Sequence, residues 1–217
     1  MRAAPLLMAA LFAEGAAAAP SACASISGPR DDGDPRRREW LRRLVREVAR
    51  GEGVDPAALE ALGTVETDLR PALGRDCELG PFQVMPSWAA VFGLAPAQLW
   101  DPRINAIAAA RIYKAAWRRW ESRYARLGDN RALRAAGWGG APLDRESFAA
   151  LAYNWGKAPR AFSRAADLRE VPIPASSAAY AVRFSRALRE ARRRAPADSG
   201  TPPGPAPSSR AGARGAW

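Results

Sequence analysis

Glu66 is the residue whose position in the sequence most clearly suggests chemistry. It follows Leu62 by four residues and Leu59 by seven, so in a helix the three side chains share one face. A carboxylate on an apolar stripe loses hydration, which raises its pKa, and the negative end of the helix dipole acts in the same direction. Such a group can serve as a general acid and then as a general base. The alternative is a solvated helix end at which Glu66 pairs loosely with Arg70.

The absence of certain residue types limits the catalytic mechanisms that this chain could use. The 217 residues include no histidine, which excludes Ser-His-Asp and Cys-His catalysis and removes the commonest ligand of catalytic zinc. The two cysteines, Cys23 and Cys77, cannot form a structural zinc site. We therefore expect chemistry that relies on carboxylates, hydroxyls, amides and cations.

The composition is that of a basic globular protein, 48% hydrophobic and 25% charged, with a formal net charge of +11. A basic surface favours anionic partners such as nucleic acid, acidic lipid or a cell-wall polymer, although an arginine-rich chain can also be basic without such a partner. Residues 191–217 hold five arginines and one aspartate, so part of this charge is expected outside the core. Because the chain has no basic-aromatic binding motif, we expect no nucleic-acid partner.

The N-terminus is typical of an export signal. Arg2 provides a positive start, residues 6–13 form a short apolar run, and an alanine-rich stretch with small-x-small cleavage sites follows. The apolar run is too short to span a bilayer as a helix. We therefore predict a signal peptide over residues 1–24 and an exported protein, periplasmic or secreted, with peripheral membrane contact or none.

The cleavage point decides what the two cysteines do. Cleavage after Ala19 would leave Cys23 and Cys77 to pair in an oxidising compartment, whereas cleavage after Ala24 would leave Cys77 alone. A lipid anchor on Cys23 is the weaker alternative, because Pro20 stands where an aliphatic residue is expected.

Helical periodicity dominates the chain beyond the signal. Aspartates at positions 55, 101 and 144 fit helix N-caps, and a proline follows the first two at the first helical position. Helices are expected over about 40–51, 55–67, 101–128, 144–152 and 174–193, with one extended piece near 82–84. The predicted fold class is mainly α, a single domain with at most a small β-hairpin.

The composition of the flanking segments sets the domain boundaries. Residues 25–37 are rich in serine, glycine, proline and mixed charge and are predicted to be a linker. Residues 195–217 are rich in proline, alanine, glycine and serine without apolar periodicity, which predicts a disordered basic tail. The folded domain is then expected over 38–194.

Motifs after the candidate acid follow one another in a recognisable order. They are Glu66-Thr67, Gly80-Pro81-Phe82-Gln83-Val84-Met85-Pro86, Asp101-Pro102-Arg103-Ile104-Asn105 and Ala152-Tyr153-Asn154-Trp155-Gly156. In these motifs, and in a closing helix that carries Tyr180, the chain resembles the soluble lytic transglycosylases, relatives of goose-type lysozyme. The resemblance covers roughly residues 40–185.

Four features depart from the family pattern. Thr67 replaces the usual serine but keeps a hydroxyl, and Pro81-Phe82 replaces a Leu-Met pair. Trp155 stands where a small residue is usual, and residues 128–143 are predicted to be an insertion. These departures concern the length and shape of the substrate-binding groove more than the chemistry.

The resemblance implies a lysozyme-like domain that cleaves the glycan strands of bacterial peptidoglycan. Glu66 would protonate the oxygen between N-acetylmuramic acid (MurNAc) and N-acetylglucosamine (GlcNAc), and then act as a base while a 1,6-anhydro ring closes on the muramic residue. Thr67, Gln83, Tyr153 and Asn154 would be the substrate-binding residues, with Asn154 shaping the turn that presents Tyr153. The resemblance implies no metal or cofactor, a monomer, and peptidoglycan as the partner.

Two other functions fit the same residues. A lysozyme-type hydrolase would use an activated water, and Asp68, Asp76 or Glu78 could supply the second carboxylate. A wall-binding component of a secretion or conjugation system would keep the fold without turnover, but the presence of both Glu66 and Gln83 argues against it.

Overall fold

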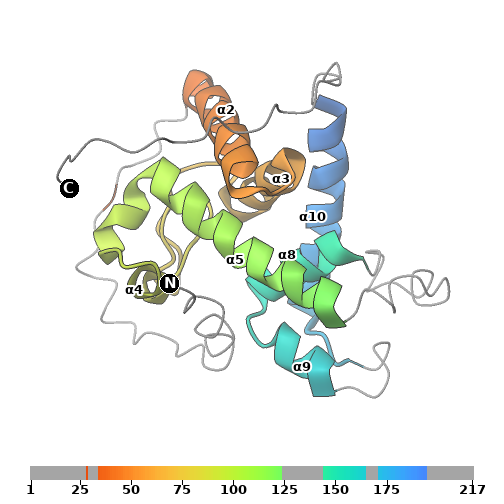
Figure 1. The fold of residues 1–217 in the computed structure, drawn as a ribbon. Coiled ribbons are helices and arrows are strands. Elements are labelled where there is room, and N and C mark those ends of the chain that lie inside the picture. The colour runs from red at the N-terminus through yellow and green to blue at the C-terminus, as the bar shows by residue number, and fades with distance from the viewer. Residues whose placement is uncertain (1–27, 29–33, 124–143, 165–170, 195–217) are drawn as a thin grey trace, which may run out of the picture.

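The computed structural model describes residues 28, 34–123, 144–164 and 171–194 (Figure 1). Residues 1–24, 128–143 and 195–217, for which a signal peptide, an insertion and a tail are predicted, lie outside these ranges. The described part is helical, and it contains no β-strand. None of its helices is both long and apolar enough to cross a membrane.

The helices follow one another along the described chain as α2 (Pro35–Glu52), α3 (Pro56–Thr67), α4 (Pro86–Val91), the 3-10 helix η2 (Pro96–Trp100), α5 (Pro102–Arg123), α8 (Arg145–Asn154), α9 (Ala158–Arg164) and α10 (Ala175–Arg194). The predicted mainly α class is confirmed. Three short helices were not predicted, α4, η2 and α9, with 6, 5 and 7 residues. Segments of this length show fewer than two turns of apolar periodicity, so pattern alone does not reveal them.

Aspartate caps begin these helices where the sequence predicts them. The Asp55 carboxylate accepts a hydrogen bond from the Ala57 N–H at 2.9 Å, and Asp144 accepts one from the Ser147 N–H at 2.8 Å. Asp101 caps α5 in the same way. Each cap satisfies a backbone donor that the first turn leaves without a partner.

Helix α2 begins earlier than predicted. Asp34 accepts a hydrogen bond from the Arg36 N–H at 2.9 Å, and Pro35 occupies the first helical position. The last three residues of the predicted linker, 35–37, are therefore helical. The apolar stripe used to place this helix starts only at Trp40, because the first turn is made of charged residues.

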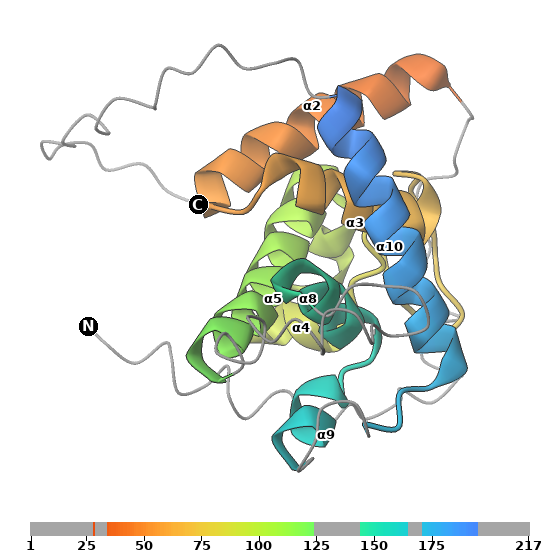
Figure 2. The same ribbon diagram turned by 90° about the vertical axis from the view of Figure 1, so that its right-hand side faces the viewer.

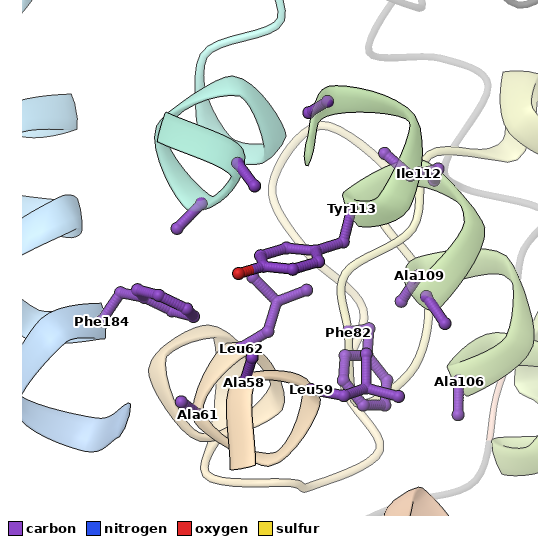
Figure 3. Close-up of a cluster of buried hydrophobic side chains, with 14 of the residues drawn as sticks. Ala58, Leu59, Ala61, Leu62, Phe82, Ala106, Ala109, Ile112, Tyr113 and Phe184 are labelled. Carbon is purple, nitrogen blue, oxygen red and sulfur yellow. The ribbon is translucent and has the colours of Figure 1, made fainter. Parts of the chain in front are cut away.

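Helix α3 lies between α2 and α10 and packs against both (Figure 1; Figure 2). Leu59 and Leu62 on it are fully buried, as the apolar stripe predicts. They lie close to Phe82, to Tyr113 of α5 and to Phe184 of α10 (Figure 3). This packing fixes the rotation of α3 about its axis, and with it the direction of Glu66 one turn further on.

A second carboxylate of α3, Glu60, is completely buried. It accepts hydrogen bonds from Arg46 of α2 at 2.9 Å and from Arg194 of α10 at 3.2 Å, and Arg42 of α2 lies 3.8 Å away. A buried charge requires such partners. Glu60 therefore connects α2 and α10 to α3 through these arginines. Its arginine partners distinguish the environment of Glu60 from that of Glu66.

Residues 68–85 connect α3 to α4 as a loop with two isolated antiparallel bridges, Leu73 to Leu79 and Leu79 to Val84. The sequence predicts at most a small hairpin, and these two bridges are what the described residues contain. Cys77 in this loop is buried and disulfide-bonded, and the chain's other cysteine lies outside the described residues.

Asn105, fully buried in the first turn of α5, holds this loop in place. Its Oδ1 accepts a hydrogen bond from the Phe82 N–H at 3.0 Å, and its Nδ2 donates to the carbonyls of Leu79 at 2.8 Å and Leu99 at 2.9 Å. Gly80 has a φ of 75°, and a Cβ there would lie 2.8 Å from the Asn105 amide. Both facts require glycine at position 80.

Candidate active site

Glu66 lies in the last turn of α3 and is partly exposed. Its Oε1 accepts a hydrogen bond from the Tyr180 hydroxyl of α10 at 2.6 Å. Arg70, the partner expected for a solvated helix end, pairs with Asp68 at 3.4 Å. The carboxyl group is thus held by a neutral hydroxyl.

Burial raises the pKa of Glu66 from its ordinary value of 4.5 to about 7. The Tyr180 hydrogen bond lowers this pKa, the charge of Glu78 raises it and the charge of Arg183 lowers it, but burial has the largest effect. Glu66 is therefore about half protonated near neutral pH. That is the state in which one carboxyl group can give a proton and take it back.

Two tyrosines lie near Glu66 and act differently. Tyr180 bonds the carboxyl group directly, whereas the Tyr153 hydroxyl donates to the Phe82 carbonyl at 2.7 Å. Burial, and then the Glu66 charge, raise the pKa of both hydroxyls well above the ordinary value. Both tyrosines are therefore neutral donors, and Tyr153 connects α8 to the loop beside Glu66.

Thr67 joins the end of α3 to the same loop. Its Oγ1 donates to the Pro81 carbonyl at 2.8 Å and accepts from the Arg70 N–H at 3.0 Å. The hydroxyl proton is therefore used within the protein. The predicted contact of Thr67 with substrate would therefore be one in which Oγ1 accepts a hydrogen bond.

Gln83 stabilises the loop through hydrogen bonds to two loop carbonyls. It adopts a left-handed backbone with a φ of 49°, and its Nε2 donates to the carbonyls of Ala72 at 3.1 Å and Gly80 at 3.0 Å. Its Oε1 lies with the Glu78 carboxylate over Gly74, in the space that a Cβ at Gly74 would need. Substrate contact by Gln83 would therefore be made through this oxygen.

Asn154 stands apart from these residues. It is exposed at the last position of α8, and its side chain makes no hydrogen bond to the described residues. Its neighbour Tyr153 points to the loop. The structure thus brings Tyr153 close to Glu66, places Thr67 and Gln83 in and beside the adjoining loop, and leaves Asn154 at the surface.

Glu78 is the loop acid that acts on the candidate acid. Its charge raises the pKa of Glu66, and its Oε2 accepts a hydrogen bond from the Asp76 N–H at 2.9 Å. Asp68 instead pairs with Arg38 at 3.0 Å, and the Asp76 side chain belongs to an exposed residue. Among the three loop acids, Glu78 is therefore the one placed to serve as a second carboxylate.

Tyr180 and Arg183 lie at the site but are not among the site residues predicted from the sequence. The sequence predicts only that a closing helix carries Tyr180, whereas in the structure its hydroxyl reaches Glu66 across 114 residues of sequence. The resemblance to the closing helix of a known family was the available signal. Nothing in the sequence singles out Arg183 among the many arginines.

Comparisons with known proteins do not assign the chain to a family. No protein-family model matches it, and no curated protein matches it either. Within the described ranges no group of three or more cysteines and acidic residues could hold a metal ion. A functional conclusion therefore rests on the geometry around Glu66 and on the order of the motifs.

Replacing Tyr180 should test how the carboxyl group is controlled. We expect Tyr180→Phe to raise the pKa of Glu66 by about one pH unit or more, because the variant loses a hydrogen bond that favours the charged form. Carboxyl-carbon NMR titration of Glu66 measures this. Tyr113→Phe is the matched control, since that buried hydroxyl reaches the Glu146 carbonyl at 3.5 Å instead. An unchanged Glu66 titration in Tyr180→Phe would contradict the assignment.

Proposed function

We propose that the protein is a peptidoglycan lytic transglycosylase with a lysozyme-like domain. The observation that carries the proposal is Glu66: a partly buried carboxyl group with a pKa of about 7, held by a tyrosine hydroxyl at the end of a core helix. The ordered motifs that resemble the soluble lytic transglycosylases supply the substrate class. No metal or organic cofactor is required for this chemistry.

In the first step, protonated Glu66 gives its proton to the oxygen that links C1 of MurNAc to C4 of GlcNAc. The bond between C1 and that oxygen breaks, and GlcNAc leaves with a free 4-hydroxyl. The N-acetyl carbonyl of the muramic residue stabilises the positive charge at C1, as in other substrate-assisted glycosidases. Glu66 is left as a carboxylate, which the Tyr180 hydroxyl stabilises.

In the second step, the Glu66 carboxylate takes the proton of the muramic 6-hydroxyl. The 6-oxygen bonds to C1 and closes the 1,6-anhydro ring, so no water is consumed and Glu66 is protonated again. Burial favours the acid of the first step and Tyr180 favours the base of the second. A pKa near 7 balances the two demands at neutral pH.

A lysozyme-type hydrolase is the second candidate, because Glu78 acts electrostatically on Glu66. Glu78 would then position or activate the attacking water. Mass spectrometry of the products from purified peptidoglycan distinguishes the two reactions. We expect 1,6-anhydro-muramic ends from both the wild type and Glu78→Gln; free reducing ends that disappear in Glu78→Gln would establish the hydrolase instead.

The cleavage rate should follow the protonation of Glu66. We expect kcat/KM on a soluble glycan to be constant at acidic pH and to fall about tenfold per pH unit above about pH 7, because the free enzyme must carry the proton. Tyr180→Phe should move this fall to higher pH. A fall centred near 4.5, the ordinary pKa of glutamate, would show that the Glu66 carboxyl group of the free enzyme is not desolvated.

We further propose that the protein acts as an exported monomer, in the periplasm or after secretion. A predicted N-terminal signal supports this, and so does the buried disulfide at Cys77, because disulfides persist in oxidising compartments. Of the two cleavage points, the one after Ala19 is the one that keeps a second cysteine, Cys23, in the mature chain. Mass measurement of the mature protein from its host tests the proposal: a chain that starts at Met1 would contradict export by cleavage.

A further inference from the structure

Arg183 presents a guanidinium group beside the candidate acid. It is an exposed residue one turn after Tyr180 on α10, and its guanidinium carbon lies 5.7 Å from the centre of the Tyr180 ring. The hydroxyl of the same ring bonds Glu66 at 2.6 Å. Contact with the ring holds the guanidinium close to the reacting carboxyl group.

This guanidinium makes no ion pair with any residue that the structure describes. Two arginines further along α10 do: Arg192 binds Asp55 at 2.8 Å, and Arg194 binds Glu60 at 3.2 Å. The charge of Arg183 acts on the Glu66 carboxyl group. When Glu66 carries its proton, it cannot neutralise Arg183, so the cation is left for an external anion.

We propose that Arg183 binds a carboxylate that the substrate carries next to the bond to be cut. This inference rests on the proposed function. Every muramic residue bears a lactyl group, which ends in a carboxylate in peptide-free strands and carries a peptide with its own carboxylates in intact ones. The planar fork of arginine binds a carboxylate through two parallel hydrogen bonds.

Such a contact would also serve the reaction. Arg183 lowers the pKa of Glu66 and so opposes the protonated form that the first step needs. A substrate carboxylate on the guanidinium would offset that charge. Glu66 would then hold its proton more firmly when the anionic substrate is bound than when the site is free.

Arg186 provides a matched control on the same helix. It is exposed like Arg183 and lies three residues further on, but its charge is not among those that shift the pKa of Glu66. Arg183→Gln and Arg186→Gln change the net charge equally. An effect on both would reflect general attraction by a basic surface, whereas an effect on Arg183 alone reflects a specific contact.

The test measures binding by isothermal titration calorimetry, with the full chain carrying Glu66→Gln so that no ligand is consumed. Three ligands of equal length are used: a peptide-free GlcNAc-MurNAc oligosaccharide, the same oligosaccharide with its lactyl carboxylates converted to methyl amides, and the peptide-bearing form. We expect Arg183→Gln to raise Kd about tenfold for a carboxylate-bearing ligand and to leave the amide unchanged. Arg183→Lys should keep part of the affinity, and Arg186→Gln all of it.

The arms of this experiment identify the source of the carboxylate. A loss confined to the peptide-free glycan assigns the lactyl carboxylate, and a loss on the peptide-bearing glycan assigns the peptide. Equal Kd values with and without Arg183, an equal loss on the amide, or binding of none of the ligands would overturn the inference. The proposed function is judged separately, by the products that the wild-type protein releases.

Discussion

Glu66→Gln is expected to lower the rate of glycan cleavage by roughly a thousandfold, the contribution typical of a general acid and base. Glutamine has the same shape and can still accept the Tyr180 hydrogen bond, but its amide cannot supply a proton or take one back. Release of anhydro-muropeptides from purified peptidoglycan measures the effect. Glu47→Gln is the control, because that carboxylate is exposed on α2 and pairs with Arg103 at 2.9 Å. Equal release by wild type and Glu66→Gln would remove Glu66 from the mechanism.

The same substitution should leave the fold intact and change how stability depends on pH. The pKa of Glu66 is about 7 in the folded protein and near 4.5 in the unfolded chain, so between these values the folded state binds more protons. Wild-type stability should therefore fall as pH rises from 4.5 to 7, by at most about 3 kcal/mol because Glu66 is partly exposed. Glu66→Gln lacks this fall, so urea titrations should find it more stable than wild type at pH 8 but not at pH 4.

Local patterns in the sequence predict the parts of the site that depend on helix geometry. The stripe formed by Leu59, Leu62 and Glu66 repeats within two turns, so it locates the candidate acid and anticipates its burial. The bond to Tyr180 is beyond the reach of such patterns, because it depends on how α10 packs across α3. The same limit applies to Arg183, which owes its position to that packing.

Motifs identify residues without saying what their polar atoms contact. Thr67, Gln83 and Tyr153 were assigned to substrate through the resemblance, yet their donor groups all bind backbone carbonyls within the protein. These bonds shape the loop that lies beside Glu66. A residue can belong to a family motif because it shapes the site or because it contacts the sugar. Its position in the motif therefore does not distinguish these two roles.

Asn105→Ala is expected to destabilise the protein by about 2 to 5 kcal/mol, because it removes a buried amide that bonds three backbone groups. The wild-type amide satisfies the Phe82 N–H and the carbonyls of Leu79 and Leu99, all from fully buried residues. Alanine would leave the Phe82 N–H and the Leu99 carbonyl without the Asn105 amide as their partner and would open a space beside Gly80. The Leu79 carbonyl would keep its other bond, from the Val84 N–H at 3.0 Å. Each unsatisfied group costs about 1 to 3 kcal/mol.

Urea unfolding at neutral pH measures this loss, and Asn154→Ala is the matched control. Asn154 is an exposed asparagine without side-chain hydrogen bonds to the described residues, so its replacement should change stability by no more than about 0.5 kcal/mol. Because Asn105 holds the backbone next to Gln83, Asn105→Ala should also slow cleavage under conditions in which it remains folded. A loss of stability no larger than that of the control would mean that the loop beside Glu66 is held by other contacts, the Thr67 and Tyr153 bonds first among them.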